Sequence, residues 1–198
     1  MQGESQPGAI VGKPAGRSTK TTIASTVAIG AAVGIAASWV KALSEPRLQR
    51  LFERLVQPTA AEKELVGADP SGHPDRMPPA ELADRLAKRV TGHGLSRQQR
   101  VSVLNPVHYT FGAALGVVYV GTAQRWPAVA RDLGVPAGLA IYGSTHAGVL
   151  PILRIQEPPW KLPTSAFLWE GTSHVLFGLA LEGFRRGFAA LADAAART

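Results

Sequence analysis

The 198-residue chain contains no cysteine. This absence excludes disulfide bonds, thiolate metal sites, cysteine-held iron–sulfur clusters and cysteine nucleophiles. Common catalytic signatures are also missing, since the sequence has no GxSxG, HExxH, P-loop or GxGxxG pattern. The sequence therefore gives no support for an enzyme.

Charged residues are nearly absent from four long stretches of the chain. They make up 18% of the sequence and gather mainly in residues 1–20, 42–100 and 185–198. Such segregation is typical of an integral membrane protein. The alternative is a soluble helical bundle, in which each helix would show a polar face. The four stretches show almost none, so the sequence favours the membrane.

The four apolar stretches predict an all-α fold, a four-span transmembrane helix bundle. Each is about long enough to cross a bilayer. The predicted spans are residues 21–41, 101–123, 135–153 and 164–184. The first stretch has an alternative as a cleaved signal peptide, because a basic segment precedes it and small residues end it. Its length and the further spans favour a transmembrane helix.

The remaining segments are predicted to lie outside the membrane. Residues 1–20 are expected to form a disordered basic tail, and residues 185–198 a polar C-terminal tail. Residues 42–100 are predicted to be an extramembrane helical insertion between spans one and two. Its first part, residues 48–56, has apolar side chains at helical spacing and predicts an amphipathic helix that lies along the membrane surface.

Local signals mark further helix ends within this insertion. Thr59 and Glu62 have the spacing of a capping box, which begins a helix. Gly92 is predicted to end a helix, and Ser96 to cap the start of the next one. The insertion is therefore expected to hold two or three short helices.

The chain is strongly basic, with a formal net charge of +7 and a pI near 10.2. In a soluble protein this charge would suggest binding to nucleic acid. Here the lysines and arginines lie at the ends of apolar stretches and in the insertion. We therefore expect them to set the topology and to contact lipid headgroups, with the lipid bilayer and not nucleic acid as the partner.

Glycines spaced four residues apart predict close helix packing. Gly30 and Gly34 lie in the first span, and Gly112 and Gly116 in the second. Small residues at this spacing let two helix backbones approach each other. The contact is expected either within one bundle or in a homo-oligomer or membrane complex.

Four polar side chains are predicted to converge inside the membrane. Glu170 and His174 lie four residues apart on one helical face of the last span. Because consecutive spans alternate in direction, His108 and His146 fall at a similar depth, roughly 6–15 Å from the same membrane face at about 1.5 Å per residue. Ionisable groups within a membrane are costly, so the cluster is a functional-site hypothesis.

The cluster has three interpretations on sequence alone. In the first, it is a structural hydrogen-bonding network in a non-enzymatic, structural or stress-related protein. In the second, His108, His146, Glu170 and His174 bind a metal or haem, since imidazole and carboxylate suit zinc, iron or manganese. The ExxxH spacing is not diagnostic, and this second interpretation is not favoured. In the third, the residues carry protons or a small solute, because histidine titrates near neutral pH.

Several segments carry a resemblance to a known family. They are WVKALSEPR, VHYTFGAALGVVY, THAGVLPILRIQEPPW and LWEGTSHVLFGLALEGFRR. In their order and local pattern they resemble the YagU-like bacterial inner-membrane proteins, a family of unknown biochemical function. The residues at the patterned positions are Lys41, Glu45, Arg47, His108, His146, Pro151, Glu170 and His174. Residues 42–100 depart from that pattern.

The resemblance implies a multi-pass protein of the bacterial inner (plasma) membrane and supplies no mechanism. Lys41, Glu45 and Arg47 follow the first span and are expected at the membrane edge. With four spans, both termini lie on one side. Basic residues close to the membrane on that side predict that the termini are cytoplasmic.

Overall fold

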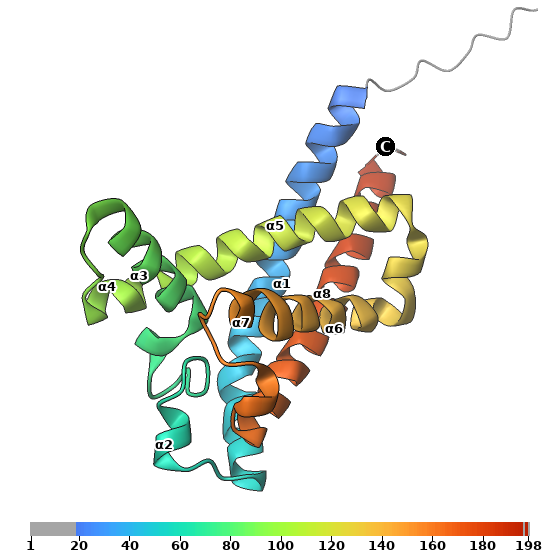
Figure 1. Cartoon of the computed structure of the whole chain (residues 1–198). Helices are drawn as coiled ribbons and strands as arrows, with labels where there is room; N and C mark the ends of the chain where they lie inside the picture. Colours follow the sequence, from blue (N-terminus) through green and yellow to red (C-terminus); the bar gives the residue numbers. More distant parts are fainter. Residues whose placement is uncertain (1–18, 196, 198) are drawn as a thin grey trace, which may run out of the picture.

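The computed structural model describes residues 19–195 and residue 197. All regular elements in this part of the chain are helical, which confirms the predicted all-α class. In chain order they are α1 (Thr19–Leu55), α2 (Ala60–Lys63), η1 (Pro74–Arg76), α3 (Pro78–Thr91), α4 (Arg97–Ser102), α5 (Leu104–Arg125), η2 (Pro127–Gly134), α6 (Val135–Ser144), η3 (Thr145–Val149), α7 (Leu150–Ile152), η4 (Pro159–Lys161) and α8 (Thr164–Ala195) (Figure 1). The disordered tail predicted over residues 1–20 lies outside the described residues, apart from Thr19 and Lys20, which begin α1.

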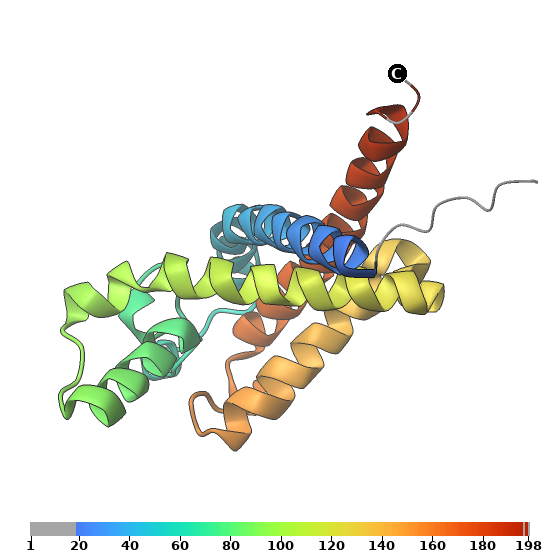
Figure 2. The same ribbon diagram turned by 90° about the horizontal axis from the view of Figure 1, so that it is seen from above.

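Two long helices run side by side, and two others cross them. Helices α1 and α8 pack against each other and run in opposite directions (Figure 1). Helix α5 packs across α1, and α6 packs against α8. Seen from above, α5 and α6 diverge from their connection at η2 toward the end where α3 and α4 lie (Figure 2). This arrangement brings side chains from all four long segments to one region.

Helix α1 is one continuous helix of 37 residues that passes through Pro46. The sequence predicts a span over residues 21–41 and a separate amphipathic helix after it. That separation is wrong, because the amphipathic stretch continues α1. Pro46 removes one backbone hydrogen bond, but Leu48 and Phe52 pack against the buried cluster around Trp169 and hold the helix beyond it.

The glycines of α1 and α5 face one another where the two helices cross. A Cβ atom added at Gly34 would lie 2.0 Å from the carbonyl oxygen of Gly112. One added at Gly116 would lie 2.2 Å from the carbonyl oxygen of Gly30. No side chain fits at these distances, so the crossing depends on glycine. Both faces are used within one chain, which removes the support they gave to an oligomer contact.

The third apolar stretch, residues 135–153, is divided among three elements. Helix α6 ends at Ser144, and η3 continues as a π-helical turn in which the Leu150 N–H bonds the carbonyl oxygen of Thr145. Pro151 follows this turn and carries no N–H of its own. A single π turn inside a helix re-aims the side chains it carries, and here it carries His146.

Two helices are long and apolar enough to cross a membrane within the described part of the chain, Ile23–Leu55 and Arg97–Arg125. The predicted span over residues 164–184 is the first part of α8, which continues to Ala195. The polar tail predicted for residues 185–198 is therefore mostly helical. The structure thus gives two candidate membrane helices from length and composition.

The short helices between α1 and α5 begin and end where the local signals predict. Thr59 and Glu62 form a capping box at α2, and Ser96 forms another with Gln99 at α4. Gly92 ends α3 in the left-handed conformation. Each of these signals acts over a few residues, so each could be predicted from sequence.

These short helices are tied together and to the bundle by charged side chains. The Asp84 carboxylate is buried and pairs with Lys88, at 2.8 Å, and with Arg100. The Lys88 ammonium beside it holds the pKa of Asp84 below its usual range. Arg85 donates a hydrogen bond to the carbonyl oxygen of Leu153, at 2.8 Å, and so links α3 to the end of α7.

Candidate ligand-binding site

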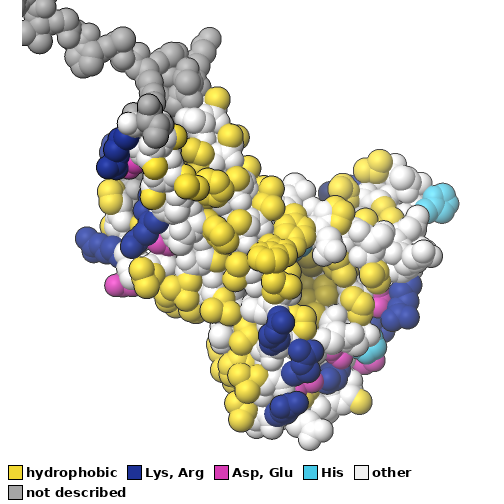
Figure 3. Space-filling model, turned by 180° about the vertical axis from the view of Figure 1, so that it is seen from behind, with side chains coloured by type: hydrophobic (Ala, Val, Ile, Leu, Met, Phe, Trp, Pro, Cys, Tyr) yellow, Lys and Arg dark blue, Asp and Glu magenta, His cyan; other side chains and the backbone are white. Residues whose placement is uncertain are grey.

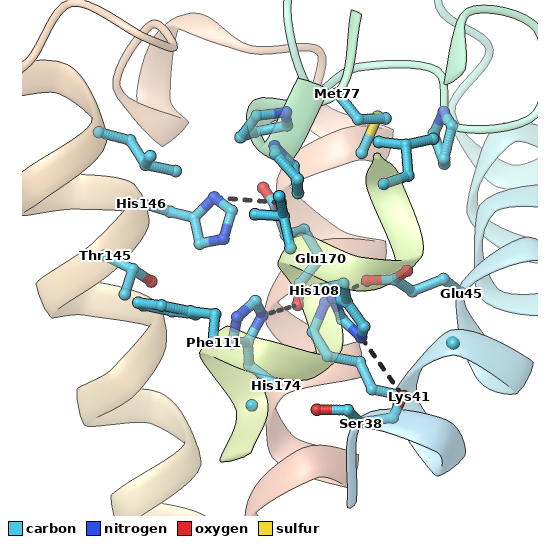
Figure 4. A pocket seen from close by; sticks show the side chains of 18 of the residues that line it. Ser38, Lys41, Glu45, Met77, His108, Phe111, Thr145, His146, Glu170 and His174 are labelled. Atoms are coloured by element: carbon cyan, nitrogen blue, oxygen red, sulfur yellow. Dashed lines mark hydrogen bonds and ion pairs between the residues drawn. The ribbon is translucent and has the colours of Figure 1, made fainter. Parts of the chain in front are cut away.

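A cavity of about 380 Å³ lies where α1, α5, η3 and α8 meet (Figure 4). Its wall has a polar part and a larger apolar part. The polar side chains are Ser38, Lys41, Glu45, Ser71, Asn105, His108, Thr145, His146, Glu170 and His174. Apolar side chains from α3, α5 and α7 make up much of the remainder. A cavity of this size and composition is typical of a small-molecule site.

Helix α8 contributes Glu170 and His174. They lie one turn apart on the buried face of the helix, and Glu170 is only 2% exposed. The Nδ1 atom of His174 lies 2.9 Å from the backbone carbonyl oxygen of Glu170. Because a carbonyl oxygen only accepts, Nδ1 carries the proton and donates it. Backbone and side chain of Glu170 thus both shape the site.

The π turn η3 contributes His146. Its Nδ1 atom lies 3.1 Å from Oε1 of Glu170 and 3.1 Å from Oε1 of Gln156, which belongs to the loop after α7. The ring stacks on Tyr142 and meets His174 edge to face, with centroids 5.4 Å and 5.0 Å away. His146 is therefore held on several sides, and Glu170 is its ionisable partner.

Helices α1 and α5 form the opposite wall. Lys41 is only 8% exposed and makes an ion pair with Glu45. Both are predicted to lie at the membrane edge, and the structure places them in the wall of the cavity. Arg47, expected beside them, is exposed and outside it. His108 faces α1, with Nε2 at 3.4 Å from the backbone carbonyl oxygen of Ser38 (Figure 4).

The polar wall keeps hydrogen-bond acceptors without partners. Each of His108, His146 and His174 donates from one ring nitrogen to an oxygen of the chain. The other ring nitrogen of each makes no hydrogen bond within residues 19–195 and 197. In a neutral imidazole this second nitrogen is an acceptor. The site thus presents three imidazole acceptors.

Glu170 adds a fourth atom of this kind. Its Oε2 atom is buried and has no hydrogen-bond partner among the described residues. The same holds for the hydroxyl groups of Ser38 and Tyr142. Buried polar atoms are nearly always hydrogen-bonded, and leaving one unpaired costs about 1–3 kcal/mol. Two of these atoms, Ser38 Oγ and Glu170 Oε2, belong to residues that line the cavity, where a bound molecule could pair with them.

The geometry does not support the metal or haem alternative. Within residues 19–195 and 197, no group of three or more histidine, aspartate or glutamate side chains is placed to hold a metal ion. His108, His146, Glu170 and His174 line one cavity. However, lining a common cavity is a weaker condition than directing donor atoms at one point. The arrangement of these four side chains therefore gives no support to a resident metal.

A second buried glutamate lies further along α8 and was not singled out from the sequence. Glu182 accepts hydrogen bonds from the Tyr119 hydroxyl at 2.8 Å, from Arg185 at 2.7 and 2.8 Å, and from Arg186 at 2.6 Å. Its spacing to the two arginines, three and four residues, is the spacing of helical ion pairs and was a usable signal.

Other residues in or beside the cavity wall could not be singled out so easily. Gln156 lies in a proline-rich loop without periodicity, so its contact with His146 has no sequence signal. Tyr142 shares a helical face with His146, which is a weak signal. Lys41 and Glu45 have the i,i+4 spacing of an ion pair, but their position after an apolar stretch suggested a membrane edge.

The comparisons with known proteins identify a family. The family described as "Protein of unknown function (DUF1440)" matches residues 55–183, which is more than half of the chain, and the chain belongs to it. The match includes most of the insertion between α1 and α5 as well as His108, His146, Glu170 and His174. No curated protein and no solved structure matches the chain.

Proposed function

We propose that this family member is a four-span protein of the bacterial inner membrane that holds a small lipid-soluble molecule in the cavity beside Glu170. The observation that carries the proposal is the unpaired, buried Oε2 atom of Glu170 at the wall of a 380 Å³ cavity. Unpaired buried polar groups are costly unless a ligand satisfies them. The proposed activity is therefore binding.

The surface supports a membrane location. Many large apolar side chains on α1, α5 and α6 are exposed, among them Ile23, Trp39, Phe111, Val118 and Leu139. Hydrophobic side chains cover the middle of the face in Figure 3, and basic side chains lie toward its ends. Monomeric soluble proteins rarely expose contiguous apolar surface on this scale. Together with the two candidate membrane helices, this supports insertion into a bilayer.

The proposal adds two further spans to the two candidate helices. These are α6 with η3 and α7, and the first two thirds of α8. Glu170, Glu182 and His174 lower the hydropathy of α8, but all three are buried against other helices, as ionisable residues in membranes are. Basic residues near the predicted membrane ends favour cytoplasmic termini. The family match and the order of the patterned residues support a YagU-like inner-membrane protein.

The natural absence of cysteine allows a direct test of this topology. We place single cysteines at the exposed positions Gln98, Arg131 and Glu157 and label cells with a membrane-impermeant maleimide. With four spans, Gln98→Cys and Glu157→Cys label from the same side, and Arg131→Cys from the opposite side. If only α1 and α5 cross the bilayer, Glu157→Cys labels together with Arg131→Cys. Release of the protein by an alkaline wash would overturn the membrane proposal altogether.

Two observations favour a ligand pocket over the two other interpretations of the cluster. A conductor for protons or solutes needs a continuous polar path. Beyond the cavity, Val33, Ala37 and Phe177 are packed in a buried apolar core. A purely structural network would satisfy its members, as the Glu182 site does, whereas Glu170 keeps an unpaired oxygen.

Filling the cavity tests the proposed function. Ala42 lines the cavity, and a phenylalanine there would occupy space that the ligand needs. Ala28 is exposed on the same helix, so Ala28→Phe is a matched control. We expect mass spectrometry of organic extracts to find a lipid-soluble molecule with the wild type and with Ala28→Phe, reduced to background with Ala42→Phe. Equal amounts with all three proteins would refute binding in this cavity.

A further inference from the structure

Resting on the proposed ligand cavity, we infer that the ligand carries a hydrogen-bond-donating head, an alcohol or an amine, on an apolar chain that leaves the cavity toward lipid. The inference combines three features of the wall. First, several acceptor atoms in the wall have no hydrogen-bond partner. Second, the lysine in the wall already pairs with a glutamate. Third, the opening of the cavity is bordered mainly by apolar side chains.

Four atoms in the wall are acceptors without a partner, while the Ser38 hydroxyl and the Asn105 amide are groups of the wall that can donate. His108, His146 and His174 each have one ring nitrogen without a partner in the described chain, and Glu170 has Oε2. Their N–H groups are already donated to oxygens of the chain. A ligand head must therefore supply hydrogen atoms to satisfy this wall. An alcohol supplies one and an amine two or three, whereas an ether or ester supplies none.

The charges in the wall disfavour an acidic head. Lys41 is the one lysine or arginine among the described residues that line the cavity, and it pairs with Glu45. A carboxylate or phosphate head would meet the Glu170 side chain and the acceptor nitrogens with no unpaired cation to compensate. A buried anionic head with no unpaired cation beside it is strongly unfavourable. The site therefore selects against anionic lipids.

The rim of the cavity is mainly apolar, and Ser71 and Asn105 are its exposed polar side chains. Leu82 from α3, Phe111 from α5, and Val149 and Leu153 from η3 and the end of α7 all line the cavity and are about half exposed. Side chains that both line a cavity and reach the surface mark its opening. A charged or polar molecule arriving from water would find polar groups there. An apolar rim instead suits a chain that passes from the cavity into surrounding lipid.

A matched set of probes tests the head group. We compare radiolabelled dodecanol, dodecylamine, dodecanoate and dodecyl methyl ether, which share an apolar chain, for retention by the protein in lipid nanodiscs over protein-free nanodiscs. We expect dodecanol or dodecylamine to be retained about tenfold better than the ether and the acid, because a factor of ten corresponds to one unpaired buried group. Retention should be lost in Ala42→Phe and kept in Ala28→Phe.

Different results would contradict the proposed ligand cavity and the inferred donor head group. If no probe exceeds the protein-free level, or if Ala42→Phe changes nothing, the cavity function itself is wrong. If the acid or the ether binds as well as the alcohol and the amine, the cavity function stands and the donor-head inference is overturned. Glu170→Leu should reduce the preference for alcohol over ether. If that variant does not fold, Glu170→Gln serves instead and should lose amine retention while keeping that of the alcohol.

Discussion

Helix α8 buries two glutamates and surrounds them differently. Glu182 is 1% exposed, and both of its carboxylate oxygens accept hydrogen bonds, from Tyr119, Arg185 and Arg186. Glu170 is buried to the same degree, yet its only ionisable partner in the described chain is His146, and its Oε2 atom has no partner there. The two carboxyl groups are therefore equally buried but differ in how many hydrogen bonds they accept.

The difference separates a structural carboxylate from one available to a ligand. The Glu182 site is closed by the chain itself, since a tyrosine from α5 and two arginines of α8 fill its hydrogen-bonding capacity. The Glu170 site is closed on one side by His146 and opens on the other to the cavity. An unpaired carboxylate oxygen is costly inside a protein, and a position that keeps one is typical of a functional site.

The largest expected effect follows from removing Glu182. Glu182→Leu keeps the volume but leaves the Tyr119 hydroxyl and two guanidinium groups without their acceptor. Breaking a buried ion pair from one side costs about 3 kcal/mol. We expect the free energy of unfolding, measured by titration with a denaturing detergent, to fall by about this amount.

Glu170→Leu provides the matched comparison on the same helix. It removes a carboxyl group with one imidazole partner, His146, and one unpaired oxygen, so little stabilisation is lost. Replacing a poorly satisfied buried charge by an apolar side chain changes stability by less than about 1 kcal/mol or increases it. If the two leucine variants were destabilised equally, the different hydrogen bonding of the two glutamates would make no difference to stability.

The fold was predictable where its signals are local. The capping box of Thr59 and Glu62 and the left-handed Gly92 each depend on a few neighbouring residues, and the structure confirms them. The continuation of α1 beyond Pro46 was not predictable, because it depends on packing against Trp169, more than a hundred positions away. Whether the third and fourth spans cross a membrane stays a prediction.

The grouping of the candidate site residues could be predicted from their estimated depth in the membrane. Alternating span directions place His108, His146 and Glu170 at one level, and the structure brings them to one cavity wall, although their role stays a prediction. That Lys41 lines the cavity was not predicted, because a lysine after an apolar stretch suggests a position at the membrane edge, which stays a prediction. Here the helix continues to Leu55, so Lys41 lies within it and turns inward.

The smallest expected effect compares two buried tyrosines. Tyr119 donates its hydroxyl hydrogen to Glu182, whereas the hydroxyl of Tyr142, whose ring contacts His146 and His174, has no partner in the described chain. Phenylalanine keeps the ring in both places. Tyr119→Phe should therefore lower the free energy of unfolding by about 1 kcal/mol, the net worth of one hydrogen bond. Tyr142→Phe should change it by less than about 0.5 kcal/mol.

The same pair also tests whether a ligand completes the Glu170 site. If the Tyr142 hydroxyl belongs to a site that a bound molecule satisfies, Tyr142→Phe should leave the ligand-free protein unchanged but reduce the stabilisation gained on adding dodecanol. Tyr119→Phe should keep that gain, since its hydroxyl is engaged with Glu182. A gain unchanged in both variants would restrict the ligand contacts to the imidazoles and Glu170. A gain lost in Tyr119→Phe alone would reverse the roles assigned to the two glutamates.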